Sequence, residues 1–420
     1  MSDGDERDAR GAGPGGGGAG QAGQAGPDVP GDESSSAEEQ RKRRFARRRA
    51  AYGSARRKFA HSSVLGSLRD RLALLESAEE LYDLDEPADM YGNGIVAALE
   101  EKVAELLGAE AAAFFPTGTM AQQVALRCWA GRTGVPTVAL HGLSHPEVHE
   151  RNALSEVSGL RPVRVTSEPR LPTAAEVRDF EEPFGALMLE LPLREAGFLL
   201  PTFEELTEIV EAARERDAVV HFDGARLWET TVHFGRPLPE IAGLADSVYV
   251  SFYKSLNGFS GAALAGPGTL IEEARAWRHR YGGQLFQQFP TALSALAGLE
   301  RELPRLPDYV RHARVVAAAL REGFAAAGLP WSRVHPDEPY TYEFQVWLPY
   351  DVDVVSEAAI RHAEESGTLL FARPWDAPGP GLAVTEIDVR APGLEWGAED
   401  VKAAVVEFVA VLMDEARKAG

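Results

Sequence analysis

Cysteine is nearly absent from this chain of 420 residues, in which Cys128 is the single example. One cysteine excludes an intrachain disulfide and any metal cluster held by several thiolates. Cys128 lies in the segment VALRCWA, whose pattern is typical of a helix. We therefore expect an inert, buried thiol and not a catalytic nucleophile.

Long hydrophobic runs and an excess of basic charge are also missing. No apolar run approaches the roughly 18 residues that a membrane helix needs, and no signal peptide opens the sequence. The chain has 43 Lys and Arg against 64 Asp and Glu, which gives a net charge of -21. A nucleic-acid-binding protein needs a broad cationic face. We accordingly expect a cytoplasmic protein that binds neither membrane nor nucleic acid.

The first 50 residues differ in composition from the rest. Residues 1 to about 40 contain almost no large apolar side chain, so burial cannot offset the entropy of ordering them. The basic run RKRRFARRR follows at 41–49, a pattern that suits nucleic acid, anionic lipid or an acidic partner. Beside an acidic body it is more typical of a solvated tether. We predict that residues 1–50 form a disordered tail with a basic run.

Strands and helices alternate from about residue 60 onward. The segment 99–108 has helical apolar spacing and stops at a glycine, and 120–131 has the same form. The segments 111–115, 218–223 and 246–254 are short apolar runs of strand type. This alternation favours an α/β fold with a mostly parallel sheet that is covered by helices on both faces.

The pattern changes beyond about residue 290, where the helices lengthen. YEFQVWLP, GTLLFARP and LAVTEIDV then follow as candidate strands of a second α+β unit. We therefore divide the rest of the chain into an N-terminal arm (51–95), a large domain (96–290) and a small C-terminal α+β domain (291–420).

The segment FFPTGTMAQQ joins the end of a strand to the start of a helix through a tight turn. Thr117, Gly118 and Thr119 offer two hydroxyls and free backbone N–H groups at the positive end of a helix dipole. This predicts a phosphate-binding turn, although threonine also caps many helices that bind no ligand.

The segment HFDGARLW places Asp223 at the end of a buried strand, where α/β sheets face a ligand crevice. An acid at such a position commonly caps the next turn, and it can instead pair with a protonated ring nitrogen. Arg226 follows three residues later, and its guanidinium suits a carboxylate or a phosphate.

The segment VYVSFYKSLNGFSGAALAG places Lys254 at the end of the next strand, before a small loop that contains glycine. A lysine at a strand end is commonly just solvated. A desolvated lysine near cations can lose its proton and form a Schiff base with a carbonyl group. Ser251, three residues earlier, is placed to contact a phosphate.

In this order, on consecutive strand ends, these features resemble the threonine aldolase and β-eliminating lyase family of fold-type I pyridoxal-phosphate enzymes. PTGTMAQQVAL is similar to the family's phosphate-binding Ser-Gly-Thr-Met stretch, and HFDGARLWET is similar to its Asp-Gly-Ala-Arg-Leu motif. HPEVHERNALSEVSGLRPVRV resembles the segment that carries the histidine stacked on the cofactor ring, here His145. The resemblance is strong over about residues 85–290 and absent before about residue 60.

The resemblance implies a seven-stranded-type sheet between helices, and pyridoxal 5'-phosphate (PLP) as the cofactor. Lys254 would hold the cofactor, Asp223 would keep its ring nitrogen protonated, and His145 would stack on it and act as a base. The remaining cofactor contacts would come from Thr117, Gly118, Thr119, Arg226 and Ser251.

The substrate implied by the resemblance is a β-hydroxy-α-amino acid, which such lyases cleave at the Cα–Cβ bond to glycine and an aldehyde. Arg226 would bind this small molecule as well as the cofactor. The family also implies a homodimer or homotetramer. Alternatives are β-elimination, dehydration or transaldol transfer on a related amino acid, and a PLP-binding regulatory protein without turnover.

Two positions depart from the family pattern. The stretch ELPLREAG has Leu193 where the family commonly has a second histidine. GLAVTEID has no arginine before Val384, although the family places its carboxylate-binding arginine there. Arg373 or Arg194 are the candidates to replace that arginine.

Histidine clustering permits one further interpretation, which is a metal site. It would be formed from His141, His145, His149 and His221. Their spacing matches no standard metal site, so we expect none.

Overall fold

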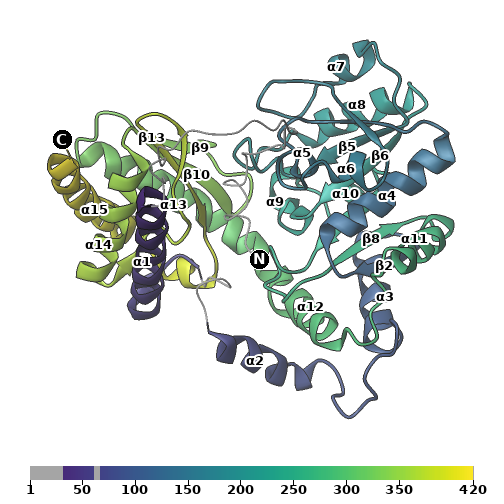
Figure 1. The fold of residues 1–420 in the computed structure, drawn as a ribbon, viewed down its shortest axis with the longest axis horizontal. Coiled ribbons are helices and arrows are strands. Elements are labelled where there is room, and N and C mark those ends of the chain that lie inside the picture. Colours follow the sequence, from purple (N-terminus) through teal and green to yellow (C-terminus); the bar gives the residue numbers. More distant parts are fainter. Residues whose placement is uncertain (1–31, 61–66, 420) are drawn as a thin grey trace, which may run out of the picture.

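The computed structural model describes residues 32–60 and 67–419, and Figure 1 shows them as two lobes side by side along the long axis. The larger lobe is built on a seven-stranded sheet and the smaller lobe on a four-stranded sheet. The strands of the large sheet are β2 (Ala111–Phe115), β3 (Thr137–Leu140), β4 (Arg161–Arg164), β5 (Ala186–Glu190), β6 (Val219–Gly224), β7 (Ser247–Ser251) and β8 (Ala262–Gly266).

The large sheet has the strand order β2-β8-β7-β6-β5-β3-β4. Strands β7, β6, β5, β3 and β4 pair in parallel, and β8 runs antiparallel to both of its neighbours, β7 and β2. The parallel strands are linked by crossovers that contain helices, whereas β7 and β8 are linked by one short loop, which suits antiparallel neighbours. The prediction of a mostly parallel, seven-stranded sheet is thereby confirmed.

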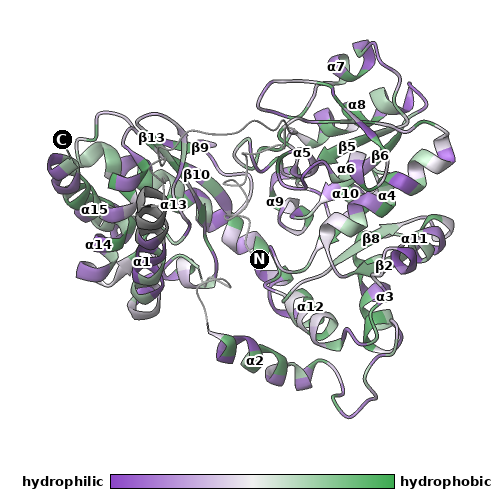
Figure 2. Ribbon diagram, viewed as in Figure 1, coloured by the Kyte–Doolittle hydropathy of each residue, from purple (hydrophilic) through white to green (hydrophobic). Residues whose placement is uncertain are grey.

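Helices cover both faces of the large sheet, and the central strands β3, β5, β6 and β7 are accordingly buried along almost their whole length. All five residues of β5 are buried. Helices α3 and α8 share a core cluster with one face, and α4 and α11 share another with the opposite face. Figure 2 shows the strands largely green and the helices with both purple and green residues. The helices of this lobe are α3 (Ile95–Leu107), α4 (Gly118–Thr133), α5 (His145–Val148), α6 (Ala153–Glu156), α7 (Ala174–Asp179), α8 (Phe203–Arg214), α9 (Thr231–Phe234), α10 (Leu238–Ala242), α11 (Gly268–Arg280) and α12 (Phe289–Arg301).

The smaller lobe has an antiparallel sheet in the order β12-β13-β10-β9 with helices on one side. Side chains of β13 alternate: Ala383, Thr385 and Ile387 are buried against the helices, while Glu386 and Asp388 point the other way. This second face is therefore polar. The elements of this lobe are α13 (Leu306–Ala326), β9 (Arg333–His335), β10 (Glu343–Leu348), α14 (Val352–Ser366), β11 (Thr368–Leu369), β12 (Asp376–Gly379), β13 (Leu382–Asp388) and α15 (Ala398–Ala419).

The segment GTLLFARP forms a shorter strand than the sequence predicts. Only β11 is extended, and it pairs in parallel with β1 (Arg57–Lys58) outside the four-stranded sheet. The arm that contains β1 thus adds a two-stranded sheet to the smaller lobe.

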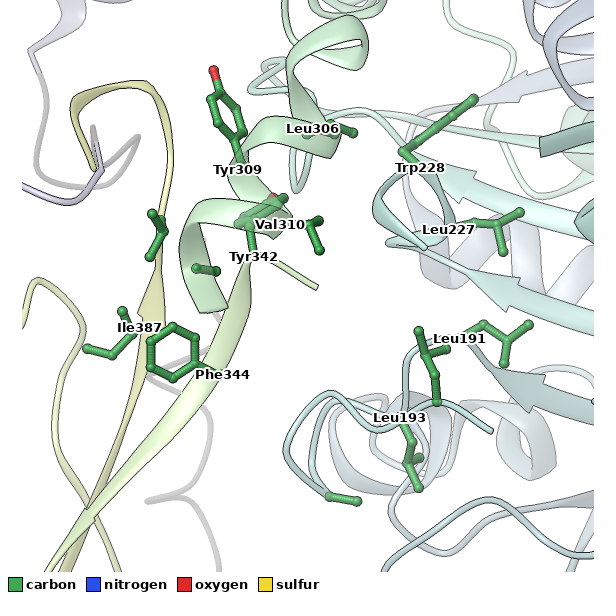
Figure 3. Close-up of a cluster of buried hydrophobic side chains, with 14 of the residues drawn as sticks. Leu191, Leu193, Leu227, Trp228, Leu306, Tyr309, Val310, Tyr342, Phe344 and Ile387 are labelled. Atoms are coloured by element: carbon green, nitrogen blue, oxygen red, sulfur yellow. The ribbon is translucent and has the colours of Figure 1, made fainter. Parts of the chain in front are cut away.

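Apolar residues of both lobes belong to one core cluster, part of which Figure 3 draws. Trp228 and Leu193 come from the larger lobe, and Leu306 and Val310 of α13 and Tyr342 come from the smaller lobe. Leu193 is fully buried, so the side chain that replaces the family's second histidine contributes to packing.

The N-terminal segment is more ordered than the sequence predicts. Residues 1–31 lie outside the described residues, but Asp32–Ser54 form helix α1, which packs on α14. Arg47 donates two hydrogen bonds to Glu364 (3.0 and 2.7 Å) and one to Glu357 (2.7 Å). The prediction of a disordered tail is therefore wrong for residues 32–50. The basic run forms ion pairs with the acidic side chains of α14, and these pairs hold it in place.

Helix α2 (Leu68–Glu76) lies beside α12 at the lower edge of the view in Figure 1 and has no buried residue. Across the described ranges, no helix is long and apolar enough to cross a membrane.

Candidate active site

Three neighbouring strands of the large sheet end in polar residues at the same edge. Glu190 is the last residue of β5, Asp223 lies one residue before the end of β6, and Lys254 follows β7 by three residues. The pairing register sets Glu190 opposite Asp223, and Asp223 opposite Tyr249. Because parallel strands present their carboxyl ends together, the side chains predicted from separate segments meet here.

Asp223 is 2% exposed and accepts a hydrogen bond from the backbone N–H of Ala225 at 3.2 Å. Burial raises the pKa of Asp223, and the positive charges of Lys254 and His145 offset only part of that effect. A buried carboxyl in this position favours a positively charged partner, because a cation would replace the solvation that the carboxylate has lost.

Glu190 is a second buried carboxyl at this edge, and the sequence analysis missed it. One of its oxygens accepts from the backbone N–H of His145 at 2.7 Å. Burial raises the pKa of Glu190 to about 7, and the neighbouring charge of Asp223 adds to the shift. The signal was present: GALMLELP, like AVVHFD, is a buried strand that ends in an acid.

His145 begins the short helix α5, and its side chain is 21% exposed. Its Nδ1 lies 3.2 Å from Oε1 of Glu150, a carboxylate that is almost completely buried. The ring of His149 is 5.1 Å from that of His145, and its Nε2 lies 2.9 Å from Oε1 of Glu195. Each histidine is therefore oriented by its own carboxylate. Glu150 fixes the orientation of the His145 ring, and Glu195 fixes that of the His149 ring.

The predicted phosphate turn forms the first turn of α4. Thr117 is the N-cap residue and accepts from the N–H of Met120 at 3.2 Å. The N–H groups of the first helical turn include those of Gly118 and Thr119. They have no partner within the helix, and they lie at the positive end of its dipole. A Cβ atom at Gly118 would overlap the hydroxyl of Tyr249, so only glycine lets the turn lie this close to β7.

Ser251 and Arg226, the other two residues predicted to contact the cofactor, both bind other residues of the protein in this structure. The hydroxyl of Ser251 is buried and donates to the carbonyl of Ala225 at 2.8 Å. Nε of Arg226 donates to Glu343 of β10 at 2.5 Å, and both side chains are about 5% exposed or less. Whether Ser251 and Arg226 also contact a ligand stays a prediction.

Lys254 lies in the loop between β7 and β8, half-buried, and its charge acts on the carboxyls of Asp223 and Glu190. Its backbone carbonyl accepts from Nη2 of Arg390 at 2.7 Å. Arg390 comes from the smaller lobe and is a further residue of the site that the sequence analysis did not identify.

The four histidines considered for a metal site have other partners. His221 lies 2.7 Å from the hydroxyl of Ser247 and 2.6 Å from Oε1 of Gln122, and burial lowers its pKa to about 3. His141 lies 2.7 Å from the carbonyl oxygen of Glu168. Within the ranges that the structure describes, no group of three or more His, Cys, Asp or Glu is arranged to hold a metal ion.

The site fits one kind of cofactor by its donor set. Asp223 suits a protonated ring nitrogen, the start of α4 suits a phosphate, and the ring of His145 suits an aromatic face. Lys254 supplies an amine that can bind a carbonyl carbon. A phosphorylated pyridine aldehyde carries all of these groups.

Comparisons with known proteins support this assignment. The family model described as beta-eliminating lyase matches residues 68–335. The low specificity L-threonine aldolase of Escherichia coli K12 is 32% identical over 246 residues, which cover 56% of this chain and 72% of that protein.

Two solved structures share the fold over most of the chain. A protein of Exiguobacterium sp. 255-15, described as an aromatic amino acid beta-eliminating lyase/threonine aldolase, has a TM-score of 0.78 and 34% identity, and covers 87% of this chain and 99% of its own. A protein of Listeria monocytogenes EGD-E, described as an L-allo-threonine aldolase, has a TM-score of 0.78 and 33% identity, and covers 89% of this chain and 99% of its own.

The raised pKa of Glu190 makes stability depend on pH. The folded protein keeps this proton up to about pH 7, whereas the unfolded chain releases it near pH 4.5. The free energy of unfolding therefore falls as the pH rises between those values. We expect wild type to lose roughly 1–3 kcal/mol relative to Glu190→Gln over this range.

The measurement is denaturant unfolding at a series of pH values, on protein freed of any cofactor, since a cation beside Asp223 would change the charges that Glu190 faces. Glu208→Gln, on the exposed side of α8, controls for the loss of one charge. A stability difference between wild type and Glu190→Gln that does not change with pH would contradict the assignment.

Proposed function

The chain belongs to the beta-eliminating lyase family, and on that premise we propose that it uses PLP to cleave a β-hydroxy-α-amino acid at the Cα–Cβ bond, to glycine and an aldehyde. The observation that carries the proposal is that Lys254, Asp223 and His145 meet at one edge of the sheet. The names of the relatives support the choice of reaction.

PLP, when bound, withdraws electrons from the Cα atom of an attached amino acid, which allows a bond at Cα to break. Asp223 would keep the ring nitrogen protonated, because its buried carboxyl favours a positive partner. Lys254 Nζ would hold the aldehyde carbon until the substrate amine replaces it. The N–H groups of Gly118 and Thr119 would bind the phosphate.

Cleavage of the Cα–Cβ bond also requires a base that takes the proton of the β-hydroxyl group. His145 suits this role, because Glu150 holds its Nδ1 and leaves Nε2 to accept the proton. The carboxylate then stabilises the imidazolium that forms. Leu193 is buried in the core and cannot contribute a second base.

The α-carboxylate of the substrate needs a cationic partner. The arginines near the polar face of the small sheet differ in how tightly carboxylates of the protein already bind them. Arg194 is held by two hydrogen bonds to Glu386, at 2.8 and 3.1 Å, and Arg226 is held by Glu343. Arg373 is 36% exposed, and its ion pair with Glu343 is long, at 3.8 Å. We propose that Arg373 binds the carboxylate, in the role that the sequence suggested for Arg226.

Replacement of Arg373 should weaken substrate binding. Loss of a charged hydrogen-bond donor costs about 1.5–3 kcal/mol, so Arg373→Met should raise KM by roughly 10- to 100-fold and change kcat less. Steady-state kinetics test this, with Arg333→Met on β9 as the matched control, because Arg333 is exposed and contacts His335 of its own strand. An unchanged KM would return the role to Arg226.

The reaction is tested by a substrate screen that separates the alternatives. The wild-type protein is incubated separately with threonine, allo-threonine, phenylserine and serine. The products measured are glycine, aldehyde and keto acid. Glycine and aldehyde in equal amounts are expected, whereas keto acid would indicate elimination. Bound PLP without any product would indicate a regulatory protein.

His145→Phe should keep the aromatic face and lose about 10²–10⁴ in rate, because a positioned base is removed. His279→Phe, on the exposed side of α11, is the matched control. Should His145→Phe cleave as fast as wild type, the base is another group, and His149 becomes the next candidate.

We extend the proposal to assembly as a homodimer or homotetramer. Helix α2 exposes Leu68 and Leu72 by 84% and 60%, and an apolar helix face of this kind is stable in water when a second copy covers it. The mass by sedimentation at micromolar concentration is expected to be at least twice that of the chain, and Leu68→Glu with Leu72→Glu should lower it. A monomeric mass for wild type would refute the proposal.

A further inference from the structure

The loop that carries Lys254 has few internal contacts of its own. It runs from the end of β7 to the start of β8 without a helix or strand. Two backbone hydrogen bonds lie within it, from the N–H of Gly258 to the carbonyl of Phe252 at 2.8 Å and from the N–H of Phe252 to the carbonyl of Gly261 at 3.2 Å, and neither involves Lys254. The backbone of Lys254 is therefore positioned mainly from outside the loop.

Arg390, from the segment that follows β13 in the smaller lobe, makes that outside contact. Its Nη2 donates to the carbonyl of Lys254 at 2.7 Å, and its Nη1 donates to the carbonyl of Ser255 at 3.2 Å. A planar guanidinium that binds two successive carbonyls fixes both their distance and their direction.

The guanidinium of Arg390 is itself held by the smaller lobe. Nη2 also donates to the hydroxyl of Tyr342 at 2.9 Å, and the guanidinium lies 4.9 Å from the centre of the Tyr342 ring. Asp388, at 3.6 Å from Nε, supplies the opposite charge. Arg390 is therefore a rigid link between the small sheet and the lysine loop.

A second arginine binds the same loop a few residues after Lys254. Arg71 of α2 donates to the carbonyl and side-chain oxygens of Asn257, at 3.2 and 3.0 Å, and to the carbonyl of Gly258 at 2.8 Å. The side chain of Arg71 makes three hydrogen bonds to the loop and that of Arg390 makes two, but none of those from Arg71 reaches Lys254 or Ser255. It therefore provides a matched control for general loosening of the loop.

We propose that Arg390 is a positioning residue, which ties Lys254 to the smaller lobe so that the amine is presented to the cofactor only when that lobe is in place. This inference rests on the proposed role of Lys254 as the residue that binds PLP. It predicts that attachment of the cofactor depends on a residue that touches neither cofactor nor substrate.

The test follows the formation of the bond between Lys254 and added PLP. The Nζ atom of Lys254 bonds to the aldehyde carbon with loss of one water, and borohydride then reduces the carbon–nitrogen double bond to a stable secondary amine. Protein freed of cofactor is mixed with PLP and quenched with borohydride at intervals, and the modified Lys254 peptide is measured by mass spectrometry.

Attachment in Arg390→Met should be slower than in wild type by about tenfold or more, since displacements near 1 Å have effects of this size or larger. Arg390→Lys should recover part of the rate, because an ammonium can still donate to one carbonyl. Arg71→Met should stay within about threefold of wild type, because the link from Arg390 to Lys254 remains.

A wild-type rate in Arg390→Met would overturn the proposal, as would equal slowing in Arg71→Met or no recovery in Arg390→Lys. If Arg390→Met does not fold, Tyr342→Phe removes one support of the guanidinium, and an unchanged rate in that variant would overturn the proposal. Failure of the proposed function is distinct, because wild type itself would then show no modified Lys254 peptide.

Discussion

Parallel pairing of β5, β6 and β7 is the constraint on which the site depends. It places the carboxyl ends of three buried strands at one edge, so that Glu190 lies opposite Asp223 and the loop of Lys254 follows next to them. Burial removes water from both carboxyls and raises the pKa of each. The packing of the sheet thus offsets the free-energy cost of burying the two carboxyls. Because a nearby cation would lower that cost, this edge favours a positively charged ring.

Arginines that cross between the lobes form the second level of organisation. Arg194 binds Glu386 and Arg226 binds Glu343 in the direction of the small sheet, while Arg390 binds the carbonyl of Lys254 in the opposite direction. Burial alone would raise the pKa of Glu343, but the charges of Arg226 and Arg373 outweigh burial and lower it. Breaking a buried ion pair of this kind typically costs about 3–5 kcal/mol, so these contacts hold the polar face of the small sheet against the site.

This arrangement accounts for the departures of the substrate side from the family pattern. Glu386 lies two residues after Val384, in the stretch that lacks the family's carboxylate-binding arginine, and it neutralises Arg194. Leu193, in place of the second histidine, extends the core between the lobes. The residues proposed to hold the cofactor occur in the order that the family shows, whereas Leu193 and the stretch around Val384 depart from the family pattern.

Local patterns in the sequence were sufficient to predict the local conformation of the segments that form the candidate cofactor site. Strand ends, the Thr117–Thr119 turn and the loop after β7 are encoded by residues that are neighbours in the chain, and each predicts its own conformation. Alternation of strands and helices was sufficient for the α/β class, because crossovers through helices lead to parallel pairing. These are the features that fold as the sequence predicts, with β7 ending three residues earlier than expected.

Only the tertiary structure decided which charged groups meet. Arg226 and Glu343 are 117 residues apart, and Arg390 is 136 residues from Lys254, so no local pattern pairs them. Helix α1 was missed for the same reason: its basic residues are unremarkable alone and become ordered against the acid side chains of α14. The sequence by itself determined the positions where chemistry is available, and long-range electrostatic complementarity, which exists only after the lobes have packed, determined the partner of each charge.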